Sequence, residues 1–270
     1  MTCNSILMCA PEFFHVDYEI NPWMTGNIQQ VNPQLAKEQW LHLFNCIKIH
    51  AEVKLMDPQN GLPDLVFTAN AALVYKDKAI ISKFKPKERK GEERHFQDWF
   101  EDNGYQTYTT GESEFEGAGD ALFDRGTERL WAAYGFRSSR ESHRKIADIL
   151  GVDVVSLNLI DPRFYHLDTC FCPLESGYLM YYPGAFSLES QETIRRSIAP
   201  EKLIIVSEDD AKNFALNAIN IGSHIIMNKS SENLRRKLDE KGFKVLEAPM
   251  SEFMKSGGST KCLTLRLNEA

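Results

Sequence analysis

Gly257-Gly-Ser-Thr-Lys-Cys262-Leu-Thr-Leu-Arg-Leu267 is the stretch of sequence that most constrains the fold. It places a cysteine at the start of an alternating, strand-like run close to the end of the sequence. A thiol there can act as a nucleophile only if this strand returns to the centre of the molecule and meets a base. We therefore expect a closed, circular architecture in which elements from both ends of the sequence pair.

Two other short motifs supply partners for that cysteine. Glu116-Gly-Ala-Gly-Asp120 carries two carboxylates, and His166-Leu-Asp168 carries an imidazole and a third carboxylate. A thiol, a histidine that moves protons, and carboxylates that orient the histidine or hold a cation form a recurring set in covalent catalysis. Each residue alone has a simpler explanation, such as a buried thiol or a core histidine, so the interpretation depends on all three motifs meeting.

The composition is typical of a globular enzyme. The chain has 270 residues, a formal net charge of −7 and 43% hydrophobic residues, and its basic residues are scattered. This balance favours a small cationic substrate and argues against nucleic acid as a partner. The six cysteines show no framework spacing, which is typical of free thiols in a reducing compartment. With no apolar run near ~18 residues and no recognisable signal peptide, we expect a cytoplasmic protein that does not enter a membrane.

One order of elements, strand, strand, helix, strand, recurs along the sequence. The first strands of successive units are expected near residues 65, 121, 165, 215 and 262. Helices are expected at about 88–103, 139–150, after Ser187 and at 232–241, and glycines follow three of them. A fifth unit joins the strand near 262 to a strand at 5–8, a helix opened by Asn32-Pro33 and a strand at 52–56. The sequence thus predicts an α/β fold of five ββαβ units, with residues 1–270 as a single domain.

A long aromatic and polar segment, residues 11–30, contains Asn21-Pro-Trp-Met24. Loops of this length in compact domains often cover binding sites. We expect either a lid over a pocket mouth or a surface loop pinned by its aromatic side chains.

Metal and dinucleotide sites are disfavoured. His166, Cys170 and Cys172 alternate and could share one face of a strand. Zinc usually takes four ligands, or three and a water, and no second cluster in the sequence supplies the rest. Gly117-Ala-Gly119 lacks the third glycine of the dinucleotide fingerprint. We therefore expect neither a metal nor a cofactor.

Taken together, the motifs resemble those of the guanidine-modifying, or pentein, superfamily, which includes arginine deiminases, dimethylarginine dimethylaminohydrolases and amidinotransferases. The resemblance covers essentially the whole chain. It rests on Pro63-Asp-Leu-Val-Phe-Thr-Ala-Asn70, Glu116-Gly-Ala-Gly-Asp120, His166-Leu-Asp168 and Cys262. It implies a five-bladed α/β propeller and a hydrolase that acts on a carbon–nitrogen bond of a linear amidine.

The resemblance also implies residue roles. Cys262 attacks the guanidinium carbon to give a covalent thiouronium, His166 protonates the leaving amine and activates water, and Glu116 orients the imidazole. The family's glutamate motif is Glu-Gly-Gly-Asp, so the extra residue here leaves Asp120 as an alternative to Glu116. The implied substrate-binding residues are Asp168 for the guanidinium, Asp64 for the α-amino group, Arg89 and Arg137 for the α-carboxylate, and Asn70, Asp120 and Asn21 around them.

Simpler roles stay open for several of these residues. Asp64 and Asn70 are residue types that cap turns. Arg89 lies in a charged run that is typical of a solvated helix start. Arg140 is an alternative to Arg137.

Asn70 replaces an aspartate that deiminases and methylarginine hydrolases carry. Phe67-Thr-Ala-Asn70 is similar to the segment in cyanobacterial arginine dihydrolases, which convert L-arginine to ornithine, carbon dioxide and two ammonias. An amide both donates and accepts hydrogen bonds, so it can also hold a neutral ureido group. The resemblance favours this activity on L-arginine or a methylated arginine, and a homo-oligomer is compatible with the sequence. The alternatives are a dimethylarginine dimethylaminohydrolase, an arginine deiminase that releases citrulline, an amidinotransferase and a non-catalytic pentein.

Overall fold

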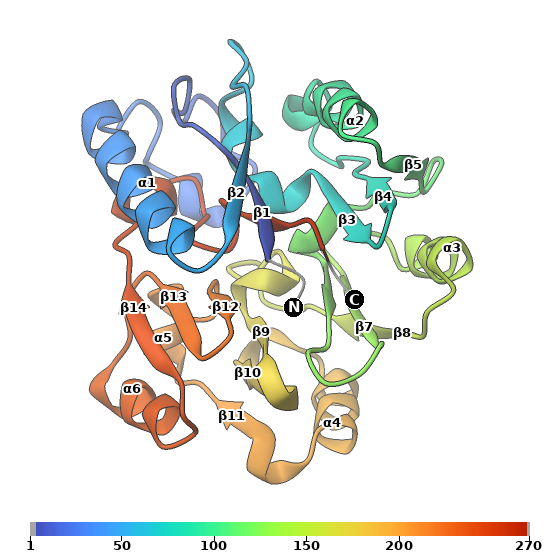
Figure 1. Cartoon of the computed structure of the whole chain (residues 1–270), viewed down its shortest axis with the longest axis vertical. Helices are drawn as coiled ribbons and strands as arrows, with labels where there is room; N and C mark the ends of the chain where they lie inside the picture. The colour runs from blue at the N-terminus through green and yellow to red at the C-terminus, as the bar shows by residue number, and fades with distance from the viewer. Residues whose placement is uncertain (1–3, 269–270) are drawn as a thin grey trace.

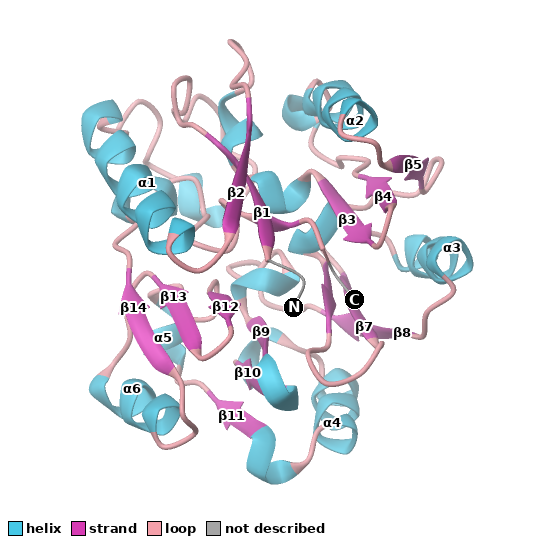
Figure 2. Ribbon diagram, viewed as in Figure 1, coloured by secondary structure: helices cyan, strands magenta, loops and turns pink. Residues whose placement is uncertain are grey.

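Five small sheets surround a common centre in the computed structural model, which describes residues 4–268 (Figure 1). Each sheet has three strands, in the orders β15-β1-β2, β3-β4-β5, β6-β7-β8, β11-β10-β9 and β12-β13-β14. The longer helices lie around the outside of the ring (Figure 2). The expected pentein fold of five ββαβ units is therefore confirmed.

The pairing of strands is the same in every unit. The first strand pairs antiparallel with the second, and the second pairs parallel with the third. A parallel pair needs a long crossover, which the helix of each unit supplies. The strands are β1 (Ser5–Cys9), β2 (Glu52–Met56), β3 (Ala72–Tyr75), β4 (Lys78–Ile81), β5 (Gln106–Thr109), β6 (Ala121–Phe123), β7 (Leu130–Tyr134), β8 (Val154–Asn158), β9 (Phe171–Leu174), β10 (Tyr178–Tyr181), β11 (Leu203–Ile205), β12 (Ile219–Ile221), β13 (His224–Met227), β14 (Lys244–Glu247) and β15 (Leu265–Arg266).

The helices begin and end close to the expected residues. The Asn32 side chain accepts hydrogen bonds from two backbone N–H groups at the start of α1, where Pro33 occupies the first helical position. Gly151 ends α3 in the left-handed conformation, with φ 70°. The helices are α1 (Pro33–Lys48), α2 (Glu92–Asp102), α3 (Arg140–Leu150), α4 (Leu188–Ser197), α5 (Glu208–Lys212), α6 (Glu232–Asp239) and α7 (Ser251–Met254).

Strand β15 closes the ring by pairing with β1, as Ile6 lies opposite Arg266 and Leu7 opposite Leu265. The Leu267 N–H also donates to the Ser5 carbonyl at 2.8 Å. Because Cys262 lies three residues before β15, this pairing carries the thiol to the centre of the molecule.

The first strands start later than expected in four of the five units. Short 3₁₀ turns occupy much of the expected strand positions, including η3 (Thr68–Asn70) and η6 (Leu167–Thr169) before β3 and β9. A similar turn, η5 (Gly117–Gly119), precedes β6. These turns satisfy backbone N–H groups locally, for example Asn70 N–H to the Phe67 carbonyl at 3.0 Å. The polar motifs therefore lie in turns that project toward the axis, and not within strands.

The hydrophobic core lies between each sheet and its helix. On α1 the buried residues Ala36, Trp40, Leu43 and Ile47 recur at helical spacing and face the sheet of β1 and β2. In the described part of the chain, no helix is long and apolar enough to cross a membrane.

Candidate active site

The polar motifs of three units meet at one end of the axis. Turns η3 and η5 contact each other, and η5 contacts η6. The segment before Cys262 completes this group, because the Ala69 N–H donates to the Cys262 carbonyl at 3.1 Å. Residues that are far apart in sequence thus become neighbours, as the three separate motifs predicted.

His166 and Glu116 form a buried pair. His166 Nε2 lies 2.7 Å from Glu116 Oε2, which also accepts a hydrogen bond from Arg137 Nη1 at 2.9 Å. Burial alone would raise the pKa of Glu116, but the Arg137 guanidinium and the His166 imidazole together lower it well below its ordinary value. Glu116 is therefore an anion that orients the imidazole.

Asp120 does not contact the imidazole by a hydrogen bond. Its Oδ2 accepts from the Ser138 hydroxyl at 2.6 Å, and its Oδ1 accepts from the Leu167 N–H at 3.1 Å. Burial raises its pKa to about 6. Of the two carboxylates in the motif, Glu116 faces the His166 imidazole, whereas Asp120 binds the backbone N–H of the next residue, Leu167.

Two glycines of the same motif allow this packing. A Cβ on Gly119 would lie 2.2 Å from Asn70 Nδ2 and 3.4 Å from His166 Nδ1. Gly117 has φ 61°, and a Cβ there would lie 2.9 Å from the Ala69 carbonyl oxygen. Gly119 has no room for a side chain while Asn70 keeps its place, and Gly117 has none while the Ala69 carbonyl keeps its place.

The Cys262 thiol is buried beside Asp168 and Asn217. Its Sγ lies 3.5 Å from Asp168 Oδ2 and accepts a hydrogen bond from Asn217 Nδ2 at 3.1 Å. Burial and the Asp168 charge raise the thiol's pKa well above its ordinary value. Burial also raises the pKa of Asp168 to about 6, although Lys261 opposes this effect. The thiol form of Cys262 is therefore favoured over the thiolate in this site.

A small cavity opens next to the thiol. The empty space within it, including its open mouth, is about 250 Å³. It combines three carboxylate- or amide-bearing residues with two guanidinium groups and the Cys262 thiol. Its lining residues are Ile20, Asn21, Met24, Asp64, Phe67, Asn70, Arg89, Arg137, Tyr165, Ser256, Gly258 and Cys262.

Arg89 is fully buried and holds Asn70 in one orientation. It makes two hydrogen bonds to Glu92, at 2.8 and 2.7 Å, and Nη1 donates to Asn70 Oδ1 at 2.9 Å. Since Asn70 Oδ1 accepts from Arg89, the amide nitrogen faces the other way and donates to the Glu116 carbonyl at 3.2 Å. The charged run around Arg89 is thus not a solvated helix start at this residue.

Asp64 is held by two hydroxyl groups. Tyr18 donates to its Oδ2 at 2.8 Å, and Ser256 donates to its Oδ1 at 3.1 Å. Asn21 Nδ2 donates to the Ser256 carbonyl at 3.0 Å, which brings the 11–30 segment onto the rim of the cavity. Arg137 Nη2 fixes the same segment through the Ile20 carbonyl at 2.9 Å.

Several residues that belong to this site were not expected from the sequence. Asn217 lies near the start expected for the fourth first strand, at about residue 215, but its contact with the sulfur was not anticipated. Tyr18, Glu92 and Ser256 were missed because an isolated hydroxyl or carboxylate carries no motif signal. Their positions depend on tertiary packing.

The metal alternative has no geometric support. Cys170 Sγ faces the Leu167 carbonyl at 3.5 Å, and Cys172 Sγ faces the Ala218 carbonyl at 3.5 Å. Within residues 4–268, no group of three or more His, Cys, Asp and Glu side chains is arranged to hold a metal ion.

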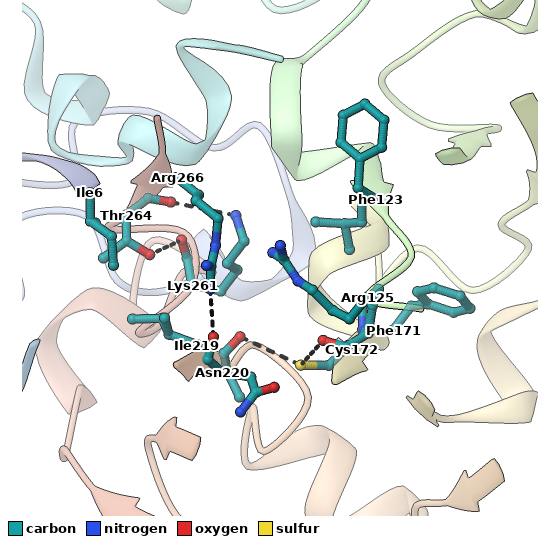
Figure 3. Close-up of a pocket in the computed structure, with 13 residues that line it drawn as sticks. Ile6, Phe123, Arg125, Phe171, Cys172, Ile219, Asn220, Lys261, Thr264 and Arg266 are labelled. Atoms are coloured by element: carbon teal, nitrogen blue, oxygen red, sulfur yellow. Dashed lines mark hydrogen bonds between the residues drawn. The ribbon is translucent and has the colours of Figure 1, made fainter. Parts of the chain in front are cut away.

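A second cavity of about 460 Å³ includes neither His166 nor Cys262 among its lining residues (Figure 3). Arg125, Lys261 and Arg266 line it, together with Cys172 and Asn220. Lys261 is the neighbour of Cys262 in sequence, but this cavity lacks the thiol, which lines the smaller cavity. The chemistry is therefore assigned to the smaller cavity.

Comparison with known proteins gives a consistent result. The family model described as N,N dimethylarginine dimethylhydrolase, eukaryotic, matches residues 19–268. A bifunctional arginine dihydrolase/ornithine cyclodeaminase from Nostoc sp. is 55% identical over 97% of this chain, which spans only 38% of that relative. An N(G),N(G)-dimethylarginine dimethylaminohydrolase from Mycobacterium tuberculosis is 40% identical, covering 97% of this chain and 85% of the relative. The substrate-bound N-terminal domain of a cyanobacterial arginine dihydrolase superimposes with a TM-score of 0.98, at 55% identity and 98% coverage of both chains.

Proposed function

Because the chain belongs to the N,N dimethylarginine dimethylhydrolase family of pentein-fold proteins, we propose that it hydrolyses the guanidinium group of L-arginine. The proposed reaction takes L-arginine and two waters to ornithine, carbon dioxide and two ammonias. The observation that carries this proposal is the contact of the Cys262 thiol with the Asp168 carboxylate, at 3.5 Å, beside the His166–Glu116 pair.

Asp168 is suited to hold the guanidinium next to the nucleophile. A carboxylate and a guanidinium form charge-assisted, often bidentate, hydrogen bonds. A guanidinium held in this way would keep its central carbon within reach of Cys262 Sγ. The bound cation would also offset the Asp168 charge that raises the thiol's pKa, so the substrate helps to form the thiolate that attacks it.

His166 is suited to move the proton. In the proposed mechanism it protonates the departing amine, which leaves as ammonia, and a thiouronium remains on Cys262. The imidazole then removes a proton from water, which attacks the same carbon and releases the sulfur to give citrulline. Glu116, kept anionic by Arg137, stabilises the imidazolium that forms in each step.

Asn70 favours a second hydrolysis over release of citrulline. Arg89 holds Asn70 Oδ1, so the amide nitrogen has one N–H on the Glu116 carbonyl and another for a substrate acceptor. The neutral ureido oxygen of citrulline is such an acceptor, whereas an aspartate would offer no donor. The relative from Nostoc sp. is named an arginine dihydrolase, which agrees with this assignment.

A second candidate is hydrolysis of methylated arginine with release of citrulline. The family model and the relative from M. tuberculosis carry that name, and the latter aligns over 85% of its length. The two candidates share the nucleophile and the imidazole. They differ in their products and in their tolerance of N-methyl groups.

We further propose that residues 1–270 act as one catalytic unit in the cytoplasm, with a small guanidine compound as partner. The described cysteines are unpaired, as is usual in a reducing compartment. The roles of Arg89, Arg137 and Asp64 in holding the α-carboxylate and α-amino groups are part of this proposal. Their presence in the cavity lining supports it.

The test is the stoichiometry of ammonia, citrulline and ornithine formed from L-arginine by the purified protein. Two ammonias and one ornithine per arginine are expected. Cys262→Ala should abolish turnover, whereas Cys46→Ala, a partly exposed cysteine of α1, should leave it unchanged. Citrulline with one ammonia would replace the proposal by a deiminase. Turnover of dimethylarginine alone would favour the second candidate, and no turnover of either would overturn both.

The role of Asn70 has its own test. Asn70→Asp should lower ornithine formation and let citrulline accumulate. Ornithine formation at the wild-type rate would contradict the role given to the amide.

A further inference from the structure

The Asn217 side chain joins the nucleophile to the loop that carries Asp168. Its Oδ1 accepts from the backbone N–H groups of Lys261 and Cys262, at 3.0 and 3.1 Å. Its Nδ2 donates to Cys262 Sγ at 3.1 Å and to the Asp168 carbonyl at 3.0 Å. Asn217 is completely buried, so these four contacts use the full hydrogen-bonding capacity of the amide nitrogen and both acceptor positions of the oxygen.

The polarity of this amide is fixed by its partners. Backbone N–H groups can only donate, so the oxygen must face Lys261 and Cys262. The Asp168 carbonyl can only accept, so the nitrogen must face the other way. A flipped amide would put two donors against donors and leave the carbonyl without a partner. The amide therefore presents an N–H to the sulfur, and never its oxygen.

The main chain of Asn217 is held just as firmly. Its carbonyl accepts from the Thr260 hydroxyl at 2.6 Å. Its N–H donates to the carbonyl of Phe214, which adopts φ 57°. The left-handed region is rare for a bulky residue, so surrounding contacts must hold this turn in place. The ring of Trp23, from the 11–30 segment, packs 4.7 Å from that of Phe214.

A fixed N–H donor favours the thiolate over the thiol, because a hydrogen bond to an anion is stronger than one to a neutral acceptor. Burial and Asp168 disfavour the anion, while Lys261 favours it. Two neutral groups also favour the anion, the Ser259 backbone and the Asn217 amide, and Asn217 is the one whose side chain contacts the sulfur. Given the proposed function, we propose that Asn217 is a further catalytic residue whose amide stabilises the Cys262 thiolate and sets its position relative to Asp168.

Asn217→Asp and Asn217→Ala distinguish stabilisation of the thiolate from a purely structural role, in which Asn217 only holds the backbone of the loop in place. Aspartate keeps an oxygen for the two backbone N–H groups but loses the donor to sulfur and adds a negative charge. Alanine loses every contact. If Asn217 only braced the loop, Asn217→Asp would be the milder change. If it stabilises the thiolate, Asn217→Asp will be the more severe one.

The readout is alkylation of Cys262 by iodoacetamide at fixed pH, followed by mass spectrometry of its peptide, which needs no substrate. Losing a hydrogen bond to a charged group, about 1.5–3 kcal/mol, raises the thiol's pKa by roughly one to two units. The thiolate fraction falls by about tenfold per unit, while its intrinsic reactivity rises by about threefold per unit. Asn217→Ala should therefore alkylate about three- to tenfold more slowly, and Asn217→Asp more slowly still.

Cys46 in the same samples serves as an internal reference. Asn228→Asp is the matched control, since Asn228 Oδ1 also accepts from a backbone N–H, that of Met250, and its Nδ2 donates to the Asn213 carbonyl. It should leave Cys262 alkylation unchanged. Thermal unfolding of each variant excludes loss of the fold as the cause.

Alkylation of Cys262 at the wild-type rate in both Asn217 variants would overturn the inference, as would a milder effect of aspartate than of alanine. Because the assay contains no arginine, it gives an answer even if the proposed function fails. If the proposed function holds, kcat for arginine should fall in the same order as the alkylation rate.

Discussion

Gly119→Ala tests the site without changing any residue that is proposed to touch the substrate. The added Cβ would lie 2.2 Å from Asn70 Nδ2 and 3.4 Å from His166 Nδ1. Ordinary van der Waals contact starts near 3.4 Å, so Asn70 must retreat by more than 1 Å. His166 can stay where it is. The substitution should therefore move the Asn70 amide away from residue 119 by more than 1 Å.

The displacement breaks two hydrogen bonds of Asn70, to Arg89 at 2.9 Å and to the Glu116 carbonyl at 3.2 Å. A hydrogen bond to a charged group contributes about 1.5–3 kcal/mol, so the free energy of unfolding should fall by a similar amount. A misplacement of about 1 Å in a catalytic site can lower the rate by about 100-fold. We expect ornithine formation to fall by about that factor, and citrulline to make up more of the product.

The assay follows ornithine and citrulline from L-arginine over time, with the unfolding midpoint measured in parallel. Gly91→Ala is the control, because a Cβ there would meet only the flexible end of the Leu62 side chain, at 2.9 Å. It should behave as the wild type. Wild-type ornithine formation by Gly119→Ala would refute the reasoning that the position of the Asn70 amide controls the second hydrolysis.

Three further results are expected. Burial raises the pKa of Asp168 from 3.8 to about 6, so the folded protein holds this proton more tightly than the unfolded chain. Protonated Asp168 therefore adds to the free energy of unfolding at a pH below its unfolded pKa. This stabilisation, about 3 kcal/mol in total, is lost as the pH rises to about 6. Asp168→Asn should remove this pH dependence of stability, which urea titrations at different pH measure. The wild type's kcat/KM should rise through about pH 6 as the carboxylate ionises, and a kcat/KM that does not change with pH would contradict this. Glu116→Gln leaves the Arg137 guanidinium buried without its carboxylate, so the free energy of unfolding should fall by about 3–5 kcal/mol. An unchanged thermal unfolding midpoint would mean that the Arg137–Glu116 ion pair does not stabilise the fold. Tyr18→Phe removes the hydroxyl that donates to Asp64 at 2.8 Å, and KM should rise by about tenfold or more with kcat little changed; an equal KM would mean that this segment does not position Asp64.

Much of the fold could be predicted from the sequence, because the signals repeat. Five copies of one order of elements, with glycines after helices and Asn32-Pro33 at a helix start, agree with each other even where any one copy is ambiguous. The expected starts of four of the five first strands were wrong, because the sequence of a 3₁₀ turn and that of a strand look alike over three or four residues. Only the tertiary contacts at the axis decide between them.

The three motifs that were expected to meet do lie together, but their detailed contacts depended on packing. The choice between Glu116 and Asp120 could not be made from spacing, since the two residues flank the same turn, η5, and only Glu116 reaches the imidazole. The orientation of Asn70 depends on Arg89, which lies 19 residues away in sequence. The contact of Asn217 with the sulfur arises from the fourth unit, where no recognisable motif marks it.

The antiparallel pairing of β15 with β1 also determines when activity can first arise during synthesis of the chain. The ribosome makes β15 some 260 positions after β1, as the partners Ile6 and Arg266 show. Contacts of such long sequence separation form slowly, because the intervening chain must be ordered first. Four units can assemble while translation continues, yet Cys262 joins them only when the segment that carries it emerges. If Cys262 is the nucleophile as proposed, a nascent chain stays inactive until its ring has closed.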